Sequence, residues 1–153
     1  MTFTFLFILG LVLSVATRYY LAGRHMRHIA KHRHEVPTDF ASKITLPEHH
    51  KAADYTMAKL RLGLIEIALS AAILISFTLL GGLQYIHELT VDILGPGILQ
   101  QITLLISISL ITGIIDLPFS WYRQFTIEER FGFNRMTPAL FFTDLIKGVL
   151  LGL

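Results

Sequence analysis

Apolar residues form long runs along the chain, and short polar connections separate these runs. About 20 predominantly apolar residues in a helix suffice to cross the hydrocarbon core of a bilayer. Three runs reach that length, at about residues 2–22, 62–86 and 98–122, and a fourth begins at Ala139. The pattern predicts an all-α fold, a polytopic membrane helix bundle with three complete spans.

The first run, TFTFLFILGLVLSVATRYYLA, admits two interpretations, a cleaved signal peptide and an uncleaved membrane helix. No positive charge precedes the run, the run is long, and no A-x-A cleavage site follows it. Tyr19 and Tyr20 stand where interfacial aromatic side chains are expected. These features favour a transmembrane helix that stays in the mature protein.

The fourth run, residues 139–153, is too short to cross a bilayer comfortably. We therefore expect the whole sequence, residues 1–153, to be the N-terminal membrane domain of a longer protein. Only the start of a fourth span would then be included.

The segment HELTVDILGPG, between the second and third runs, is expected to be a loop because Gly95 and Pro96 break regular structure. It begins like the zinc-protease helix H-E-x-x-H, in which two histidines one turn apart hold the metal. Val91 stands where the second histidine would be. We therefore expect no zinc site at His87 and Glu88.

Composition agrees with a lipid environment. Hydrophobic residues make up 53% of the chain and charged residues 16%, and the mean hydropathy is +0.59. Soluble domains carry about 25% charged residues. The absence of cysteine excludes disulfides and thiolate metal sites, and a net charge of +2 gives no basic domain for nucleic acid.

Basic residues predict the orientation. Most of them fall between residues 23 and 61, none falls between 87 and 97, and three fall between 123 and 138. By the positive-inside rule, loops 23–61 and 123–138 are cytoplasmic and the N-terminus is outside. A bacterial inner membrane is the first expectation for its location, with membrane lipids as partners. The residues concerned are Arg24, Arg27, Lys31, Arg33, Lys43, Lys51, Lys59, Arg61, Arg123, Arg130 and Arg135.

The first loop should be partly helical, because good helix formers follow Pro47. It also carries six histidines, of which His28 and His32 have the i,i+4 spacing that places two imidazoles on one helical face. No third ligand follows in a fixed pattern. A solvated basic surface beside anionic lipid headgroups is favoured over a metal site.

Four ionisable residues lie within the apolar runs, where charge is costly and usually functional. At 1.5 Å per residue, all four fall within roughly 6–14 Å of the predicted cytoplasmic boundary. They predict either one polar chamber open to the cytoplasm or helix packing through polar groups. The four are Glu66, Asp116, Asp144 and Lys147.

A polar stripe on the third span ends at Asp116, with Ser109, Thr112, Gly113 and Ser120 at helical spacing. Such a stripe should face protein or water instead of acyl chains. Pro118 removes a backbone donor beside the acid.

The connector FTIEERFGFNRMTP places several polar residues between two apolar runs. Gly132 permits a tight turn, and Thr137–Pro138 resembles a helix start. We expect an ordered amphipathic connector at the cytoplasmic surface. Its polar residues are Glu128, Glu129, Arg130 and Asn134.

The stretch LPFSWYRQFTIEERFGFNRMTPALFFTDLIKG resembles the type I CAAX prenyl endopeptidases, which are integral-membrane zinc metalloproteases. The segment VPTDFASKITLPEHHKAADYTMAKLRL is similar to the part of that family ahead of the second span. The resemblance covers most of residues 18 to 150.

The resemblance implies a water-filled proteolytic chamber, with zinc held by H-E-x-x-H and a distant glutamate. It also implies peptide or prenylated-peptide substrates. Because those ligands would lie downstream of Leu153, no catalytic or metal-binding residue is assigned here, and the chain alone is expected to be inactive. The connector residues would line the chamber with Glu66, Asp116, Asp144 and Lys147. The alternative is a non-enzymatic membrane bundle or a small proton-coupled transporter subunit that uses Glu66 and Asp116.

Overall fold

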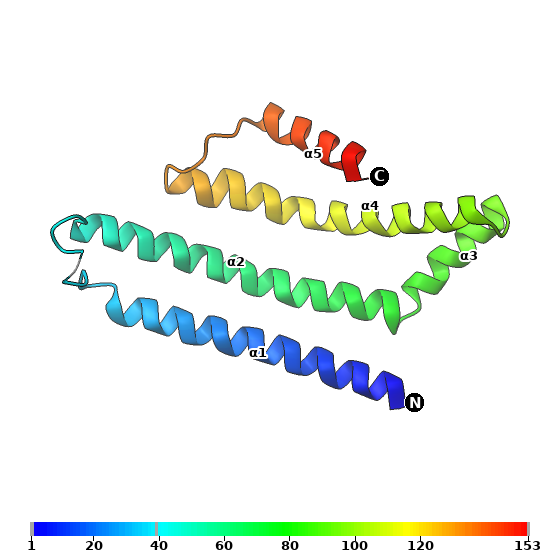
Figure 1. Ribbon diagram of the computed structural model, residues 1–153, viewed down its shortest axis with the longest axis horizontal. Coiled ribbons are helices and arrows are strands. Elements are labelled where there is room, and N and C mark those ends of the chain that lie inside the picture. The colour runs from blue at the N-terminus through cyan, green and yellow to red at the C-terminus, as the bar shows by residue number, and fades with distance from the viewer. Residues whose placement is uncertain (1, 39, 153) are drawn as a thin grey trace. The chain divides into compact units, whose positions relative to one another are not determined.

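The structure, a computed structural model, describes residues 2–38 and 40–152, and within them every regular element is helical (Figure 1). The predicted all-α class is therefore confirmed. The elements are α1 (Thr2–His32), α2 (Leu46–Thr78), α3 (Gly82–Leu94), α4 (Ile98–Tyr122), a π-helical turn η1 (Arg123–Glu128) and α5 (Pro138–Gly152).

The protein is an integral, multi-pass membrane protein. Three of its described helical segments are long and apolar enough to cross a bilayer: Thr2–His32, Leu46–Thr78 and Ile98–Glu128. Large apolar side chains are exposed on these segments and on α5 as well, from Phe3 on α1 to Leu151 on α5. A helix that is apolar all round needs lipid or other helices as its surroundings.

The chain forms two compact units that divide between Leu74 and Ile75, inside α2. In the first unit, α1 and α2 run side by side in opposite directions (Figure 1). The Tyr19 hydroxyl donates to the Leu64 carbonyl at 2.7 Å, and Arg33 pairs with Asp54 at 2.8 Å. These contacts tie the two helices at two well-separated levels.

The first predicted loop is mostly helix. α1 continues to His32 instead of ending near residue 22, and α2 already begins at Leu46. At that start, the Thr45 hydroxyl and backbone N–H both donate to the Glu48 carboxylate, at 2.7 and 2.8 Å. This reciprocal cap satisfies backbone donors at the helix end, which explains why the helix starts ahead of its apolar part.

The segment HELTV is helical, so the expected loop at His87 and Glu88 is wrong. α2 ends at Thr78, Gly81 takes a left-handed conformation with φ of 79°, and α3 begins at Gly82. The chain therefore breaks at the glycine pair, and Gly95 ends the new helix instead of interrupting a loop.

α3 is fastened to α4 by a buried amide. Gln100 is 3% exposed, and its Nε2 donates to the Thr90 hydroxyl at 2.9 Å and lies 3.1 Å from His87 Nδ1. His87 and Thr90 are one turn apart on α3, so a single side chain of α4 reaches both. The role of His87 here is to pack two helices together.

Replacing Gly82 with alanine should destabilise the second unit. A Cβ there would stand 2.8 Å from the Ser76 carbonyl oxygen, so the backbone must shift at a cost of about 1–3 kcal/mol. Gly63→Ala is the control, because a Cβ there meets no atom within 4 Å. Thermal unfolding should show a lower midpoint for Gly82→Ala only, and equal midpoints would contradict the tight break.

Candidate functional site

The candidate site is the connector between α4 and α5, together with the polar side chains of these helices. α4 begins and ends within the predicted range, at Ile98 and Tyr122, and then passes into η1. A π-helical turn widens the helix by one residue and is frequent at functional sites. It turns Ile127 inward, where its side chain is 4% exposed.

An aromatic cluster joins the end of α4 and η1 to α5. The ring of Trp121 lies 4.2 Å from that of Phe125, one turn later, and 5.5 and 5.8 Å from Phe141 and Phe142. Phe125 also meets Phe141 edge-on at 5.7 Å. Aromatic pairs in such geometries stabilise beyond the area they bury, by about 0.5–1.5 kcal/mol each.

The helix ends in a turn that closes on its own backbone. Gly132 takes a φ of 73°, a left-handed conformation that glycine adopts without steric cost. The N–H groups of Phe133 and Asn134 donate to the Glu128 carbonyl at 2.8 and 3.2 Å, and that of Gly132 to Glu129 at 3.0 Å. The tight turn predicted at Gly132 is confirmed.

The Asn134 side chain connects both ends of this turn. Its Oδ1 accepts from the Gln124 amide and from the Met136 N–H at 2.8 Å, while its Nδ2 donates to the Glu129 carboxylate at 2.7 Å. One amide thus binds η1, the turn and the extended segment after it. It also fixes the position of the Glu129 carboxylate.

The next helix starts as predicted. The Thr137 hydroxyl accepts the Leu140 N–H at 3.2 Å, and Pro138 occupies the first helical position. There the missing N–H of proline costs nothing. The connector is therefore ordered from the last turn of η1 to the first turn of α5.

The polar stripe of α4 is exposed at Ser109, Gly113, Asp116 and Ser120. Ser109 donates to the Leu105 carbonyl at 2.9 Å, and Thr112 donates to the Ile108 carbonyl at 2.9 Å. Both hydroxyls thus bond within their own helix.

Asp144 lines a cavity of about 390 Å³ between α4 and α5, with Ser109 and Gly148 among its walls. Lys147 Nζ lies 3.9 Å from the Asp144 carboxylate, and both side chains are about half exposed or more. The cavity thus has Asp144 of α5 and Ser109 of α4 in one lining.

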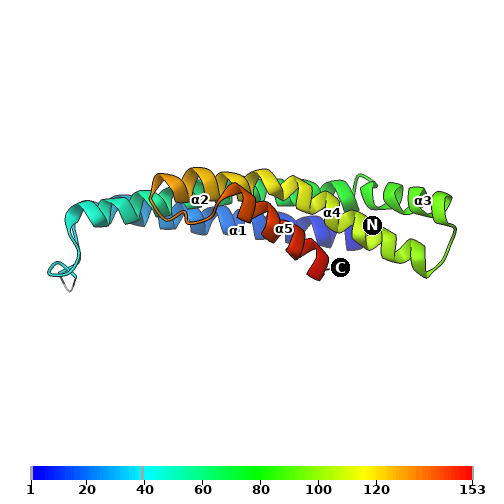
Figure 2. The same ribbon diagram turned by 90° about the horizontal axis from the view of Figure 1, so that it is seen from above.

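The segment between the turn and α5 sets where α5 begins. Residues 133–137 are outside any helix, and an extended chain advances by up to 3.3–3.6 Å per residue. Figures 1 and 2 both show this segment running back along α4 before α5 begins. The first turn of α5 then packs against the end of α4 and η1, where Phe141 meets Trp121 and Phe125.

The remaining predicted residues fall into two groups. Glu128 is half-buried and Glu129 and Arg130 are exposed, all at the end of the helix. Glu66 is half-buried on α2 in the first unit, so a shared chamber with Asp116 stays a prediction.

Within residues 2–38 and 40–152, no three His, Asp or Glu side chains are grouped so that they could hold a metal ion. The chain's own described residues therefore do not fit a zinc site. What the connector can do chemically is hold carboxylates and aromatic rings in fixed positions.

Sequence reasoning missed Gln124 and the cluster around Trp121. The i,i+4 spacing of Trp121 and Phe125 was a readable signal for the cluster. The pairing of Gln124 with Asn134 has no local signal, because it depends on the π-helical turn.

A sequence model of the family described as "CAAX prenyl protease N-terminal, five membrane helices" matches residues 25–153. CAAX prenyl protease 1 of Saccharomyces cerevisiae is 26% identical over 142 residues, covering 86% of this chain and 31% of the relative. The homolog from Dictyostelium discoideum is 30% identical over 142 residues, covering 87% and 32%. The chain thus spans about a third of the length of these relatives.

A crystal structure of Ste24p from S. mikatae superposes with a TM-score of 0.83 at 25% sequence identity. The match covers 92% of this chain and 34% of that one.

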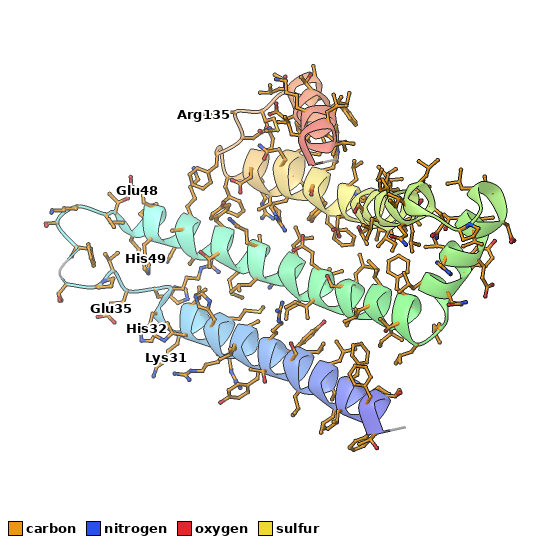
Figure 3. The ribbon with its side chains drawn as sticks, turned by 45° about the vertical axis from the view of Figure 1, so that its right-hand side comes forward. Lys31, His32, Glu35, Glu48, His49 and Arg135 are labelled. Atoms are coloured by element: carbon orange, nitrogen blue, oxygen red, sulfur yellow. The ribbon has the colours of Figure 1, made fainter. Side chains whose placement is uncertain are left out.

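Replacing Asn134 with alanine should loosen the connector, because it leaves Gln124, Glu129 and the Met136 N–H without this partner. We expect a loss of about 1–3 kcal/mol in the free energy of unfolding. The fluorescence of Trp121, the single tryptophan of this sequence, measures the unfolding of the connector directly. Arg135→Ala, at the adjacent exposed side chain (Figure 3), is the matched control. Identical unfolding curves for both variants would contradict the role of the amide.

Proposed function

This chain belongs to the family of CAAX prenyl protease N-terminal domains, and from that premise we propose that it forms part of the wall of a membrane-embedded proteolytic chamber. Since the chain spans about a third of its relatives, the activity belongs to the whole parent protein. That activity is hydrolysis of peptide bonds, with a prenylated CAAX-type C-terminus as the substrate class that the relatives' names indicate.

The observation that carries this proposal is the exposed acid on α4. A charged side chain facing acyl chains costs at least about 2.5–3.5 kcal/mol, so Asp116 should face water or protein. The hydroxyls of Ser109 and Thr112 already bond within α4 and need no partner helix. This arrangement supports a water-facing stripe more than a purely packing one.

The connector supports the same proposal. Asn134 holds the Glu129 carboxylate, and the aromatic cluster holds α5 against the end of α4. A rigid connector of this kind would fix the cytoplasmic edge of the chamber and position the polar side chains of α4 and α5. Glu128, Glu129, Asn134, Asp144 and Lys147 are proposed to line or support the chamber with Glu66 and Asp116.

Zinc is proposed for the parent protein only. The described residues offer no fitting ligand set, so we assign its ligands to another part of the parent and derive no catalytic step here. When bound, zinc in a metalloprotease activates a water molecule for attack on the peptide carbonyl.

The product of the complete reading frame that encodes this chain should cleave a farnesylated CAAX peptide. Asp116→Asn should lower kcat/KM about tenfold to a hundredfold while the melting temperature stays unchanged, because misplaced substrate loses rate without loss of fold. Asp92→Asn, at an exposed carboxylate of α3, is the control and should leave both unchanged. Absence of peptide cleavage by the wild type would overturn the proposed function. Loss of stability without loss of rate per folded molecule would make Asp116 a packing residue.

We also propose an orientation with the N-terminus outside and loops 23–61 and 123–138 cytoplasmic, from the distribution of Lys and Arg. The relatives reported above come from eukaryotes, so the expected bacterial inner membrane gains no support from them.

Single cysteines test the orientation cleanly, because the chain has none of its own. In sealed spheroplasts or cells, a membrane-impermeant maleimide should label Asp92→Cys and leave Ser42→Cys unlabelled until the membrane is permeabilised. The opposite labelling pattern would reverse the orientation.

A further inference from the structure

A cavity of about 520 Å³ lies within the first unit, between the end of α1, the segment that follows it and the start of α2. Its polar wall consists of four imidazoles and one carboxylate. In Figure 3, His32 and His49 lie at the facing ends of the two helices, with Glu35 on the segment between them. The polar lining residues are His25, His28, His32, Glu35 and His49, together with the hydroxyls of Thr38 and Thr56.

Helical periodicity brings these imidazoles together. His25, His28 and His32 lie at i, i+3 and i+7, so they share one face of α1. From α2, His49 turns toward the same space and its Nε2 lies 3.0 Å from the His32 carbonyl. The extension of α1 beyond its apolar part is what creates this face.

Two of the rings are fixed by backbone carbonyls. His32 Nδ1 donates to the His28 carbonyl at 2.9 Å, and His49 Nε2 donates to the His32 carbonyl. Since these nitrogens carry protons, each ring can take up a second proton at its other nitrogen without losing its carbonyl bond. The site can therefore become cationic with its geometry kept.

An anion would favour that second protonation. The rings of His28 and His32 lie only 4.3 Å apart, so two imidazolium charges there repel each other unless a negative group lies beside them. Among the described residues, Glu35 lines the cavity, Arg33 is paired with Asp54 at 2.8 Å, and the cations Arg24, Arg27 and Lys31 stand on the same turns of α1. Binding of an anion and uptake of protons should thus be coupled.

The remaining wall is apolar, with Ile29, Val36, Pro37 and Ala53 in it. A free inorganic anion has no use for such a wall, whereas an amphiphile does. The first imidazole comes just after the apolar part of α1, which ends near Ala22, so the cavity falls about 5–15 Å beyond it at 1.5 Å per residue. The headgroup region of a bilayer extends about 5–7 Å beyond the hydrocarbon core, so the end of the cavity at His25 reaches it.

Exposed cations stand on the same turns of α1, at Arg24, Arg27 and Lys31. Basic side chains next to a membrane span attract anionic lipids by about 1 kcal/mol each. We propose that this cavity is a binding site for the phosphate headgroup of an anionic glycerophospholipid, with the imidazoles on the phosphate and the apolar wall against the carbon atoms of the headgroup beside it.

Native mass spectrometry tests this proposal. The product of the complete reading frame is titrated with phosphatidylglycerol and, separately, with phosphatidylcholine. Phosphatidylglycerol should bind more tightly, and more tightly at pH 6 than at pH 8. The variant His28→Gln/His32→Gln should lose about fivefold in affinity per imidazole at pH 6, by the strength of one cation near a membrane surface. Its affinity for phosphatidylcholine should not change.

His34→Gln is the matched control. His34 lies two residues after His32 in the sequence, but its ring packs edge-on against that of His50, outside the cavity lining. His28→Lys guards against loss of fold in the double variant. A permanent positive charge there should retain phosphatidylglycerol binding at pH 8.

Equal affinity for the two lipids, or unchanged phosphatidylglycerol binding in the double variant, would overturn the proposal. Displacement of the lipid by millimolar inorganic phosphate would identify a free-anion site instead. Loss of binding on adding a chelator would identify a metal site instead. None of these readouts depends on peptide cleavage, so this inference and the proposed function fail separately.

Discussion

Wherever a helix ends, its terminal N–H and C=O groups lose their partners within the helix and must find others. The connector after α4 meets this constraint through Asn134. Its amide accepts from Gln124 and Met136 and donates to Glu129, while the backbone carbonyl of Glu128 accepts two N–H groups. Only with these bonds in place can the chain leave one helix and enter another as a fixed structure. The Glu129 carboxylate and the Glu128 backbone carbonyl thus take part in the hydrogen bonds that end this membrane helix.

The path of the connector then determines which polar groups of the second unit meet. Because residues 133–137 are extended, they carry the chain back along α4 before Thr137 caps the next helix. Asp144 of α5 consequently lines one cavity with Ser109 of α4. Polar side chains are exposed along the length of α4, at Ser109, Asp116 and Ser120, which supports the proposed water-facing wall.

Local patterns predicted much of this fold. The bounds of α4 agree with the expected span because Gly97 precedes the apolar run and Arg123 follows it. The start of α5 at Pro138 and the turn at Gly132 were readable from their residue types. The helix break at Gly81–Gly82 was missed, since apolar residues continue across it to Ile86 and hydropathy carries no information on the left-handed backbone of Gly81. The amide bonds of Asn134 and Gln100 were also out of reach, because both depend on which helices pack together.

The histidines show how one helix boundary changes a chemical interpretation. With the apolar span ending near residue 22, the sequence aligned only His28 and His32, by their i,i+4 spacing, and offered no further ligand in a fixed pattern. Because α1 continues to His32, helical spacing aligns His25 with them, and the start of α2 adds His49 from the opposite side. The sequence predicted a basic surface beside anionic headgroups. The cavity involves the same chemistry, but it assigns that chemistry to particular side chains. The difference is that a diffuse surface attracts any anionic lipid, whereas carbonyl-fixed imidazoles beside an apolar wall can hold one lipid in a defined orientation.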